Sequence, residues 1–142
     1  METKLDLGVH DQLSIEQEML WFDTALFDDG IALMANSKEQ ICAEKIRSLL
    51  RIGPASTRFK DVFDIYFILC REGVNDSKFV QAMNALVYEA FDMREGNSRE
   101  VRDRLSYVLN DHRFRHNLAR SRNNWLGANV GKVVSGILMC FE

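Results

Sequence analysis

The sequence has few helix breakers and no segment that would cross a membrane. Its only proline, Pro54, follows Gly53 in "IGPAST" and marks a break between two predicted helices. No apolar run reaches about 18 residues, so no transmembrane helix is predicted. The N-terminal "METKLDLGVH" lacks the long apolar core of a signal peptide. We therefore expect a cytoplasmic protein with no membrane partner.

Cysteine is also scarce, and its spacing excludes the common zinc motifs. The three cysteines, Cys42, Cys70 and Cys140, are far apart, and no C-x-x-C pair or Cys/His cluster occurs. Each has apolar neighbours in the sequence. We interpret them as buried free thiols in a reducing compartment.

The charged residues are unevenly distributed along a chain of about one domain in length. Residues 1–40 contain nine acidic residues and two lysines, whereas residues 94–122 contain eight arginines and four acidic residues. An arginine-rich surface can bind phosphate groups. It can equally be a solvated helical surface with ion pairs, and the sequence leaves both interpretations open.

The hydrophobic pattern predicts a mainly α protein with a short β segment at its N-terminus. "TKLDLGV" (3–9) alternates like a strand, and "EMLWF" and "GIALMA" are two more strand candidates separated by a turn at "FDDG". We predict a partial strand segment over residues 1–36 and a helical domain of five to six helices over 37–142. The first two expected helices cover about residues 38–51 and 57–73, and the third begins at about residue 76 and extends towards Phe91. A fourth begins at a cap at Ser98, a fifth segment contains Phe114 and Trp125, and the sixth is the C-terminal "VGKVVSGILMCF".

Lys45 is a charged residue on the apolar side of the first predicted helix. Ser37 and Gln40 form a capping-box pattern that starts this helix. On a helical wheel, Lys45 lies between Ile41 and Leu49, inside the apolar arc. The lysine either lays its stem on the core and reaches solvent, or points its ammonium into a cleft that binds phosphate or carboxylate.

The second predicted helix is apolar nearly all round but carries two aspartates on one narrow strip. Asp61 and Asp64 are three residues apart and are therefore neighbours on the helix surface. They can stabilise the first turns of the helix and pair with Arg58 and Lys60. Alternatively they face a site, where they bind a hard cation or act as a general base.

These two helices resemble the AbiEii/AbiGii toxin family of nucleotidyltransferases. The matching residues are the "AEK" of Ala43–Lys45 and the "R-x-K-D-x-x-D-I" of residues 58–65. "KLDLGV" resembles the last core strand of the family, with Asp6 at its acidic position, and later segments resemble its C-terminal helices. The resemblance implies a fold related to polymerase β-type nucleotidyltransferases. It also implies Mg²⁺-dependent transfer of a nucleotide from an NTP to an RNA or protein acceptor, which is tRNA in some relatives. An antitoxin would be the protein partner.

The resemblance also implies roles for individual residues. Lys45 would contact the triphosphate, Asp61 would be a metal-supporting carboxylate or base, and Asp64 would support Asp61. Asp6 would be a third core carboxylate near the metal. The other nucleotide-binding candidates are Arg58 and Arg51. Arg51 has a family-like spacing after Lys45, although the helical wheel places it on the opposite side of the helix.

One family feature is missing from the sequence. The family has a "GG-S/T" turn and a D-x-D carboxylate pair before the strand that matches Asp6, and neither occurs in this chain. Two-metal transfer needs that pair. We therefore expect the C-terminal part of a nucleotidyltransferase that is inactive on its own. The alternatives are a non-catalytic module that forms a homodimer through "TKLDLGV" or binds RNA or another partner, and a purely structural ion-pair network.

Overall fold

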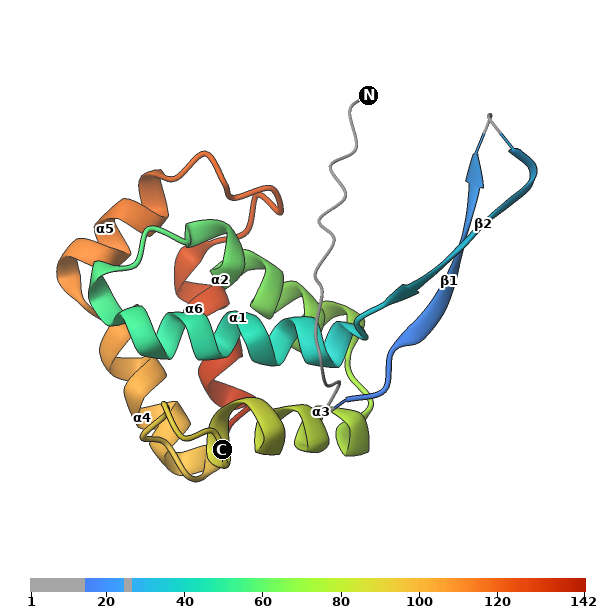
Figure 1. Cartoon of the computed structure of the whole chain (residues 1–142). Helices are drawn as coiled ribbons and strands as arrows, with labels where there is room; N and C mark the ends of the chain where they lie inside the picture. Colours follow the sequence, from blue (N-terminus) through green and yellow to red (C-terminus); the bar gives the residue numbers. More distant parts are fainter. Residues whose placement is uncertain (1–14, 25–26) are drawn as a thin grey trace.

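The computed structural model describes residues 15–24 and 27–142, and it is mainly helical. A two-stranded hairpin precedes six α-helices, as the sequence predicted, and projects away from the helical body (Figure 1). The strands are β1 (Glu18–Thr24) and β2 (Phe27–Ala35). The helices are α1 (Lys38–Ile52), α2 (Phe59–Tyr66), α3 (Asp76–Met83), α4 (Ser98–Leu109), α5 (His112–Arg120) and α6 (Val130–Met139).

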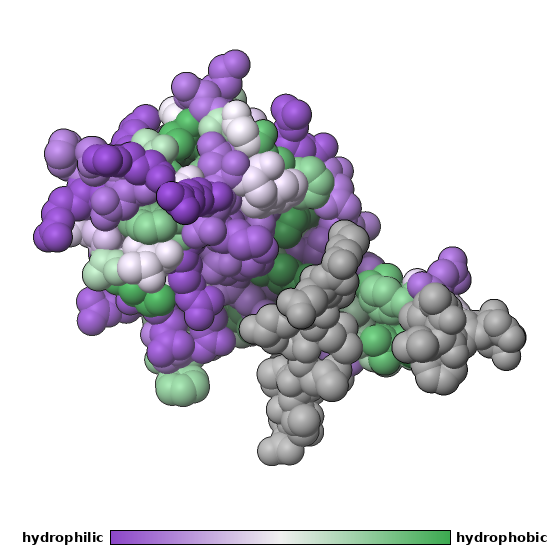
Figure 2. Space-filling model, turned by 90° about the horizontal axis from the view of Figure 1, so that it is seen from above, coloured by the Kyte–Doolittle hydropathy of each residue, from purple (hydrophilic) through white to green (hydrophobic). Residues whose placement is uncertain are grey.

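The hairpin pairs its strands antiparallel, with Trp21 opposite Ala32. The predicted strands are confirmed, but the turn at "FDDG" is wrong, because residues 27–30 already belong to β2. Several large apolar side chains of the hairpin are exposed: Met19, Leu20, Trp21, Phe22 and Met34. Figure 2 shows this apolar hairpin beside a helical body whose visible face is largely hydrophilic. The predicted strand over residues 3–9, with Asp6, lies outside the described residues.

Helix α1 begins at the predicted cap and runs through the centre of the helical body (Figure 1). The Ser37 hydroxyl accepts a hydrogen bond from the backbone N–H of Gln40 at 3.2 Å. The other half of the capping box does not form, because the Gln40 side chain donates to Glu44 instead. The buried face of α1 packs against α2, α3 and α4. That face consists largely of Cys42, Ala43, Ile46, Leu49 and Leu50.

The second predicted helix forms over the predicted range but changes its geometry half-way. Helix α2 continues without a break as a π-helical segment, η2 (Phe67–Glu72), and ends at Gly73, where φ is +80°. A positive φ is accessible to glycine at little cost, which explains the helix stop. A short 3-10 turn, η1 (Gly53–Ala55), separates α1 from α2 as the glycine–proline pair predicted.

Close packing of α2 and η2 on α6 depends on Gly136. A methyl group at this position would lie 2.7 Å from a ring carbon of Tyr66 and 3.3 Å from the sulfur of Cys70. Such distances are too short for a side chain, so glycine allows α6 to approach the second helix. The core of the whole body is formed by aliphatic side chains of α1–α6 with Phe63 and Phe114 at its centre.

Three local predictions are wrong. The third helix ends as the π-helical segment η3 (Asn84–Tyr88), so Phe91 lies beyond it and is fully exposed. Helix α4 is capped by Asn97, whose side chain accepts from Glu100 N, and Ser98 is its first residue. Trp125 lies in the segment after α5, not on that helix.

The cysteine prediction holds for one residue of three. Cys42 is buried, and burial raises the pKa of its thiol to about 12. Cys70 and Cys140 are exposed, with their sulfur atoms 3.6 Å apart. Apolar neighbours in the sequence did not reveal this exposure, because it depends on how η2 and α6 pack with each other and with the rest of the chain.

None of the helices in residues 15–24 and 27–142 combines the length and the apolar character that a bilayer-spanning helix requires.

Candidate functional site

Lys45 and the two aspartates of α2 form a single cluster. The Lys45 ammonium donates a hydrogen bond to Asp61 Oδ1 at 2.6 Å, and its Nζ lies 3.0 Å from Asp64 Oδ2. The helices α1 and α2 pack side by side, and the three-residue spacing of the aspartates directs both carboxylates to the same side of α2. The structure thus brings together the three residues for which the sequence suggested a catalytic role.

This cluster is largely shielded from water but still reachable. The exposed fraction is 22% for the Lys45 side chain and 13% for each aspartate side chain. Burial lowers the pKa of Lys45, but hydrogen bonds and charges from Asp61 and Asp64 outweigh it, so the pKa ends above the ordinary value of 10.5. Lys45 therefore stays protonated at neutral pH and is the fixed positive charge of the cluster.

Two cations form the outer rim of the cluster. Arg58 Nη1 lies 3.5 Å from Asp61 Oδ2, and Lys60 Nζ lies 3.4 Å from Asp64 Oδ2. Both side chains are mostly exposed, at 60% and 66%. The ion pairs of Arg58 and Lys60 with the aspartates, which the sequence suggested as a structural alternative, therefore exist. They occur in addition to the more shielded contacts of Lys45. Exposed pairs of this kind contribute little to stability.

Trp125 completes the cluster from a distant part of the chain. Its indole Nε1–H donates to Asp64 Oδ1 at 2.9 Å, while its ring packs edge-on with Phe67 at a centroid distance of 5.2 Å. Sequence reasoning missed this contact, because it treated Trp125 as an apolar residue of the fifth helix. No spacing rule links residues 61 positions apart, so only a tertiary structure reveals it.

Arg51 lies on another side of α1 and does not contact the cluster directly. Its Nη1 is 3.4 Å from Asp92 Oδ2, and Arg47 Nη2 contacts both oxygens of the same carboxylate at 2.7 and 2.8 Å. Arg51 does share a depression of about 570 Å³ with Arg58, which reaches Asp61. Arg58 thus connects the Lys45 cluster to the arginines of α1.

The described residues do not by themselves form a magnesium site. Nowhere in residues 15–24 and 27–142 do three or more His, Cys, Asp or Glu side chains gather closely enough to hold a metal ion. Asp61 and Asp64 do supply carboxylate oxygens, but the Lys45 ammonium already occupies the position between them. Asp6, the carboxylate expected near the metal, lies outside the described residues.

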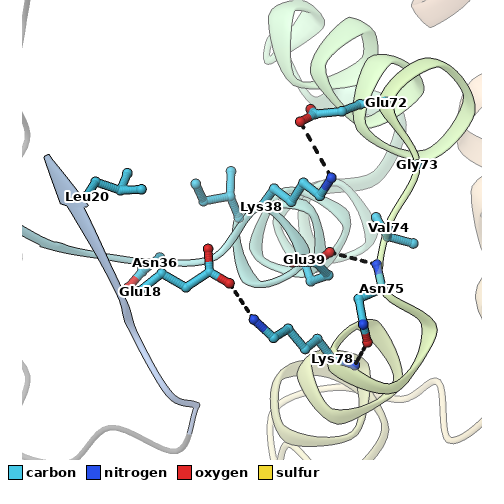
Figure 3. A pocket seen from close by; sticks show the side chains of 11 residues that line it. Glu18, Leu20, Asn36, Lys38, Glu39, Glu72, Gly73, Val74, Asn75 and Lys78 are labelled. Carbon is cyan, nitrogen blue, oxygen red and sulfur yellow. Dashed lines mark hydrogen bonds and ion pairs between the residues drawn. The ribbon is translucent and has the colours of Figure 1, made fainter. Parts of the chain in front are cut away.

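A larger cavity lies elsewhere, at the base of the hairpin (Figure 3). Its volume is about 830 Å³, and none of the cluster residues lines it. Its lysines are paired with carboxylates, Lys38 with Glu72 and Lys78 with Glu18, as the figure shows. Size alone would select this cavity, but both of its lysines are already paired with carboxylates, and its third carboxylate, Glu39, accepts a hydrogen bond from the backbone N–H of Asn75.

The residues of the Lys45 cluster lie in the part of the chain that matches a known protein family. Residues 2–127 match the family described as "Nucleotidyl transferase AbiEii toxin, Type IV TA system". The chain belongs to this family. No curated protein and no solved structure shows a significant match. Membership of the AbiEii family suggests toxin-type nucleotide transfer and implies an antitoxin partner. It confirms the resemblance inferred from the "AEK" and "R-x-K-D-x-x-D-I" helices, and both helices lie within the matched residues.

Proposed function

We propose that the Lys45 cluster handles the triphosphate of a nucleotide in a toxin-type nucleotidyltransferase. The observation that carries this proposal is an ammonium held by two carboxylates that still keeps 22% of its side-chain surface exposed. Two contacts orient the ammonium and leave one of its three N–H groups for a phosphate oxygen. The AbiEii family provides the reaction class that needs such a group.

The neighbouring residues take complementary roles. In nucleotidyl transfer an acceptor hydroxyl attacks the α-phosphorus, the bond to the bridging oxygen breaks and pyrophosphate leaves. Asp61 accepts the proton of that hydroxyl, while Asp64 positions Lys45 through its ion pair. Arg58 binds the outer phosphates, and Arg51 extends the positive surface along the depression they share.

We further propose that these 142 residues bind a nucleotide without transferring it. The D-x-D pair that would hold Mg²⁺ on the triphosphate is absent from the sequence. The described carboxylates face an ammonium and do not replace that pair. The acceptor in the complete reaction is RNA, for which tRNA is the first choice to test, or a protein.

A calorimetric titration of the chain with an NTP and Mg²⁺ tests the binding role. Lys45→Met keeps the stem of the side chain and removes the charge, so we expect affinity to fall by about ten-fold or more. Lys60→Met is the matched control, because Lys60 is exposed on the rim, and its affinity should stay within about three-fold of wild type. Equal affinities in all three proteins contradict the proposal.

A transfer assay tests the second part. Incubation with labelled NTP, Mg²⁺ and RNA should leave both the RNA and the protein unlabelled. Labelling that disappears in Asp61→Ala would show that the chain is sufficient for catalysis, and would overturn the statement that it only binds.

A second candidate function is RNA binding through α5, and a specific observation favours it. Residues 112–122 contain four arginines and no acidic residue, and none of the four forms an ion pair with any residue in the described part of the chain. Three of these arginines lie on α5 and Arg122 lies just after it, and arginines without acidic partners are suited to a phosphate backbone. Affinity for a single-stranded RNA should fall steeply with salt in wild type and less steeply in Arg113→Gln/Arg120→Gln. No RNA binding at low salt removes this candidate.

A further inference from the structure

Trp125 is an aromatic side chain held at the edge of the Lys45 cluster with half of its surface open. Its exposed fraction is 51%. A large indole that stays half exposed leaves apolar surface in contact with water, although its N–H group has found a hydrogen-bond partner. Among the described residues, Trp125 is the exposed aromatic side chain that donates a hydrogen bond to the Lys45 cluster. The ring of Tyr107, which is also exposed, instead packs against the guanidinium group of Arg104.

The segment that carries Trp125 is closed by its own hydrogen bonds. The Asn124 side chain donates to Ala128 O at 2.9 Å and accepts from Ala128 N at 3.2 Å. The reversal passes through Gly127, whose φ of +59° suits glycine. The indole is then fixed at two points, by Asp64 at its N–H and by Phe67 at its ring. An ordered aromatic platform costs little entropy when a ligand stacks on it.

Trp125 and Lys45 contact the same carboxylate. The two oxygens of Asp64 connect them: Oδ1 accepts from Trp125 and Oδ2 pairs with Lys45. A nucleotide presents an anionic triphosphate and a planar base, and an ammonium beside an exposed indole offers a partner for each. We propose that Trp125 is the stacking platform for the base of the incoming nucleoside triphosphate, an inference that rests on the proposed function of the cluster.

This assignment determines the base preference. The indole N–H is already used by Asp64, so the ring contributes its π-face and no hydrogen bond that would read the base edge. Stacking is tolerant because every base has a π-face. We therefore expect purine and pyrimidine nucleotides to bind alike, with a modest advantage for the larger purines.

Tryptophan fluorescence of the full chain tests the platform directly, because the sequence contains only two tryptophans. Trp21 lies on the hairpin and is 70% exposed, so Trp21→Phe leaves Trp125 as the single indole without disturbing the cluster. Titration of this variant with an NTP and Mg²⁺ should quench the fluorescence to saturation. Inorganic tripolyphosphate, which has the charge but no base, should bind and leave the fluorescence nearly unchanged.

Two substitutions separate stacking from the hydrogen bond to Asp64. Trp125→Leu should weaken NTP binding by about ten-fold and leave tripolyphosphate binding unchanged, since stacking on an aromatic side chain has about this effect. Trp125→Phe keeps a stacking ring and loses the N–H, so it should remain within about three-fold of wild type. Thermal unfolding of each variant confirms that it is folded.

The possible outcomes distinguish the two proposals. If NTP and tripolyphosphate bind with equal affinity and Trp125→Leu changes neither, the platform is wrong while the triphosphate role of Lys45 stands. If neither ligand binds, the proposed function fails and the platform fails with it. Quenching by a short single-stranded RNA but not by NTP overturns the assignment to the incoming nucleotide.

Discussion

Helix α1 carries two ion clusters that use opposite arrangements of charge. In the Lys45 cluster one ammonium lies between two carboxylates, whereas around Asp92 one carboxylate lies between the guanidinium groups of Arg47 and Arg51. The carboxylates of both clusters are largely shielded, at 13% exposed for each aspartate of the first and 21% for Asp92, and each cluster has exposed cations at its outer edge, such as Arg51 at 57% in the second. The first cluster therefore gathers two shielded carboxylates around one cation, and the second holds one shielded carboxylate between a half-buried and an exposed guanidinium group.

The two clusters differ in how strongly their carboxylates depend on a single cation. Two shielded carboxylates that share one cation depend on it, whereas an exposed guanidinium group such as that of Arg51 remains solvated without a partner. A cluster whose shielded carboxylates depend on one cation, and which is still partly open, is suited to a functional site. A cluster with a cation that remains solvated is suited to the surface. The comparison gives four predictions, which follow from the largest expected effect to the smallest.

Removing the central cation of the first cluster should have the largest effect. Lys45→Met leaves two shielded carboxylates facing each other, and we expect a loss of about 2 kcal/mol in the free energy of unfolding at pH 7, below the roughly 3–5 kcal/mol of a fully buried pair because water still reaches the site. Urea unfolding at pH 7 measures this loss. A variant as stable as wild type at pH 7 contradicts the account.

The same pair of proteins should differ in alkaline stability. The folded pKa of Lys45 lies above 10.5, its ordinary value, so its contribution to stability is complete below that pH and is lost as the pH rises through the folded pKa. Wild type and Lys45→Met should therefore converge in stability as the pH rises beyond 10.5 and through the folded pKa of Lys45. Unfolding curves at a series of alkaline pH values measure the difference, and a constant difference would show that the charge of Lys45 is not its cause.

The arginines around the shared depression should affect nucleotide binding in a graded way. Arg58→Gln removes a cation next to Asp61, and we expect NTP affinity to fall by about ten-fold, while Arg51→Gln should lower it by about three-fold. Neither variant should lose measurable stability, because both side chains are mostly exposed. Calorimetric titration measures both affinities. If Arg51→Gln lowered the NTP affinity more than Arg58→Gln, the triphosphate would lie on the Asp92 side of α1 instead.

The smallest effect is expected in the second cluster. Hydrogen bonds from Arg47 lower the pKa of Asp92, with the charges of Arg47 and Arg51 adding to the shift, so the carboxylate contributes stability above its ordinary pKa of 3.8 and loses it as the pH falls through the folded value. Asp92→Asn should therefore be slightly less stable than wild type at pH 7 and equal to it in strong acid. Parallel acid titrations of both proteins, followed by circular dichroism, check this. NTP affinity should not change.

Much of the fold and the centre of the site could be predicted from local patterns. The Ser37 cap, the Gly53–Pro54 break and the stop at Gly73 depend on the backbone preferences of a few adjacent residues, and these determine α1 and the second helix. The helical wheels identified Lys45 on an apolar face and the two aspartates on one strip of the next helix, because charged residues are conspicuous on helices that are otherwise apolar. Local chemistry was sufficient where neighbouring residues alone decide the conformation.

The remaining features depend on tertiary contacts that no spacing rule contains. The contact of Trp125 with Asp64 and the exposure of Cys70 result from how distant segments pack. The position of Arg51 beside Asp92 follows from the chain after η3, which the sequence did not place. A one-dimensional pattern indicates which face of a helix is polar, but it does not indicate what lies opposite that face.

The location of the bound nucleotide tests the central claim most directly. Backbone amide NMR shifts of the chain, recorded during titration with an NTP and Mg²⁺, would map it. The account predicts shifts around Lys45, Asp61 and Trp125, with little change at the hairpin cavity near Asn75. Shifts at the hairpin cavity, with none around Lys45 and Asp61, would contradict it.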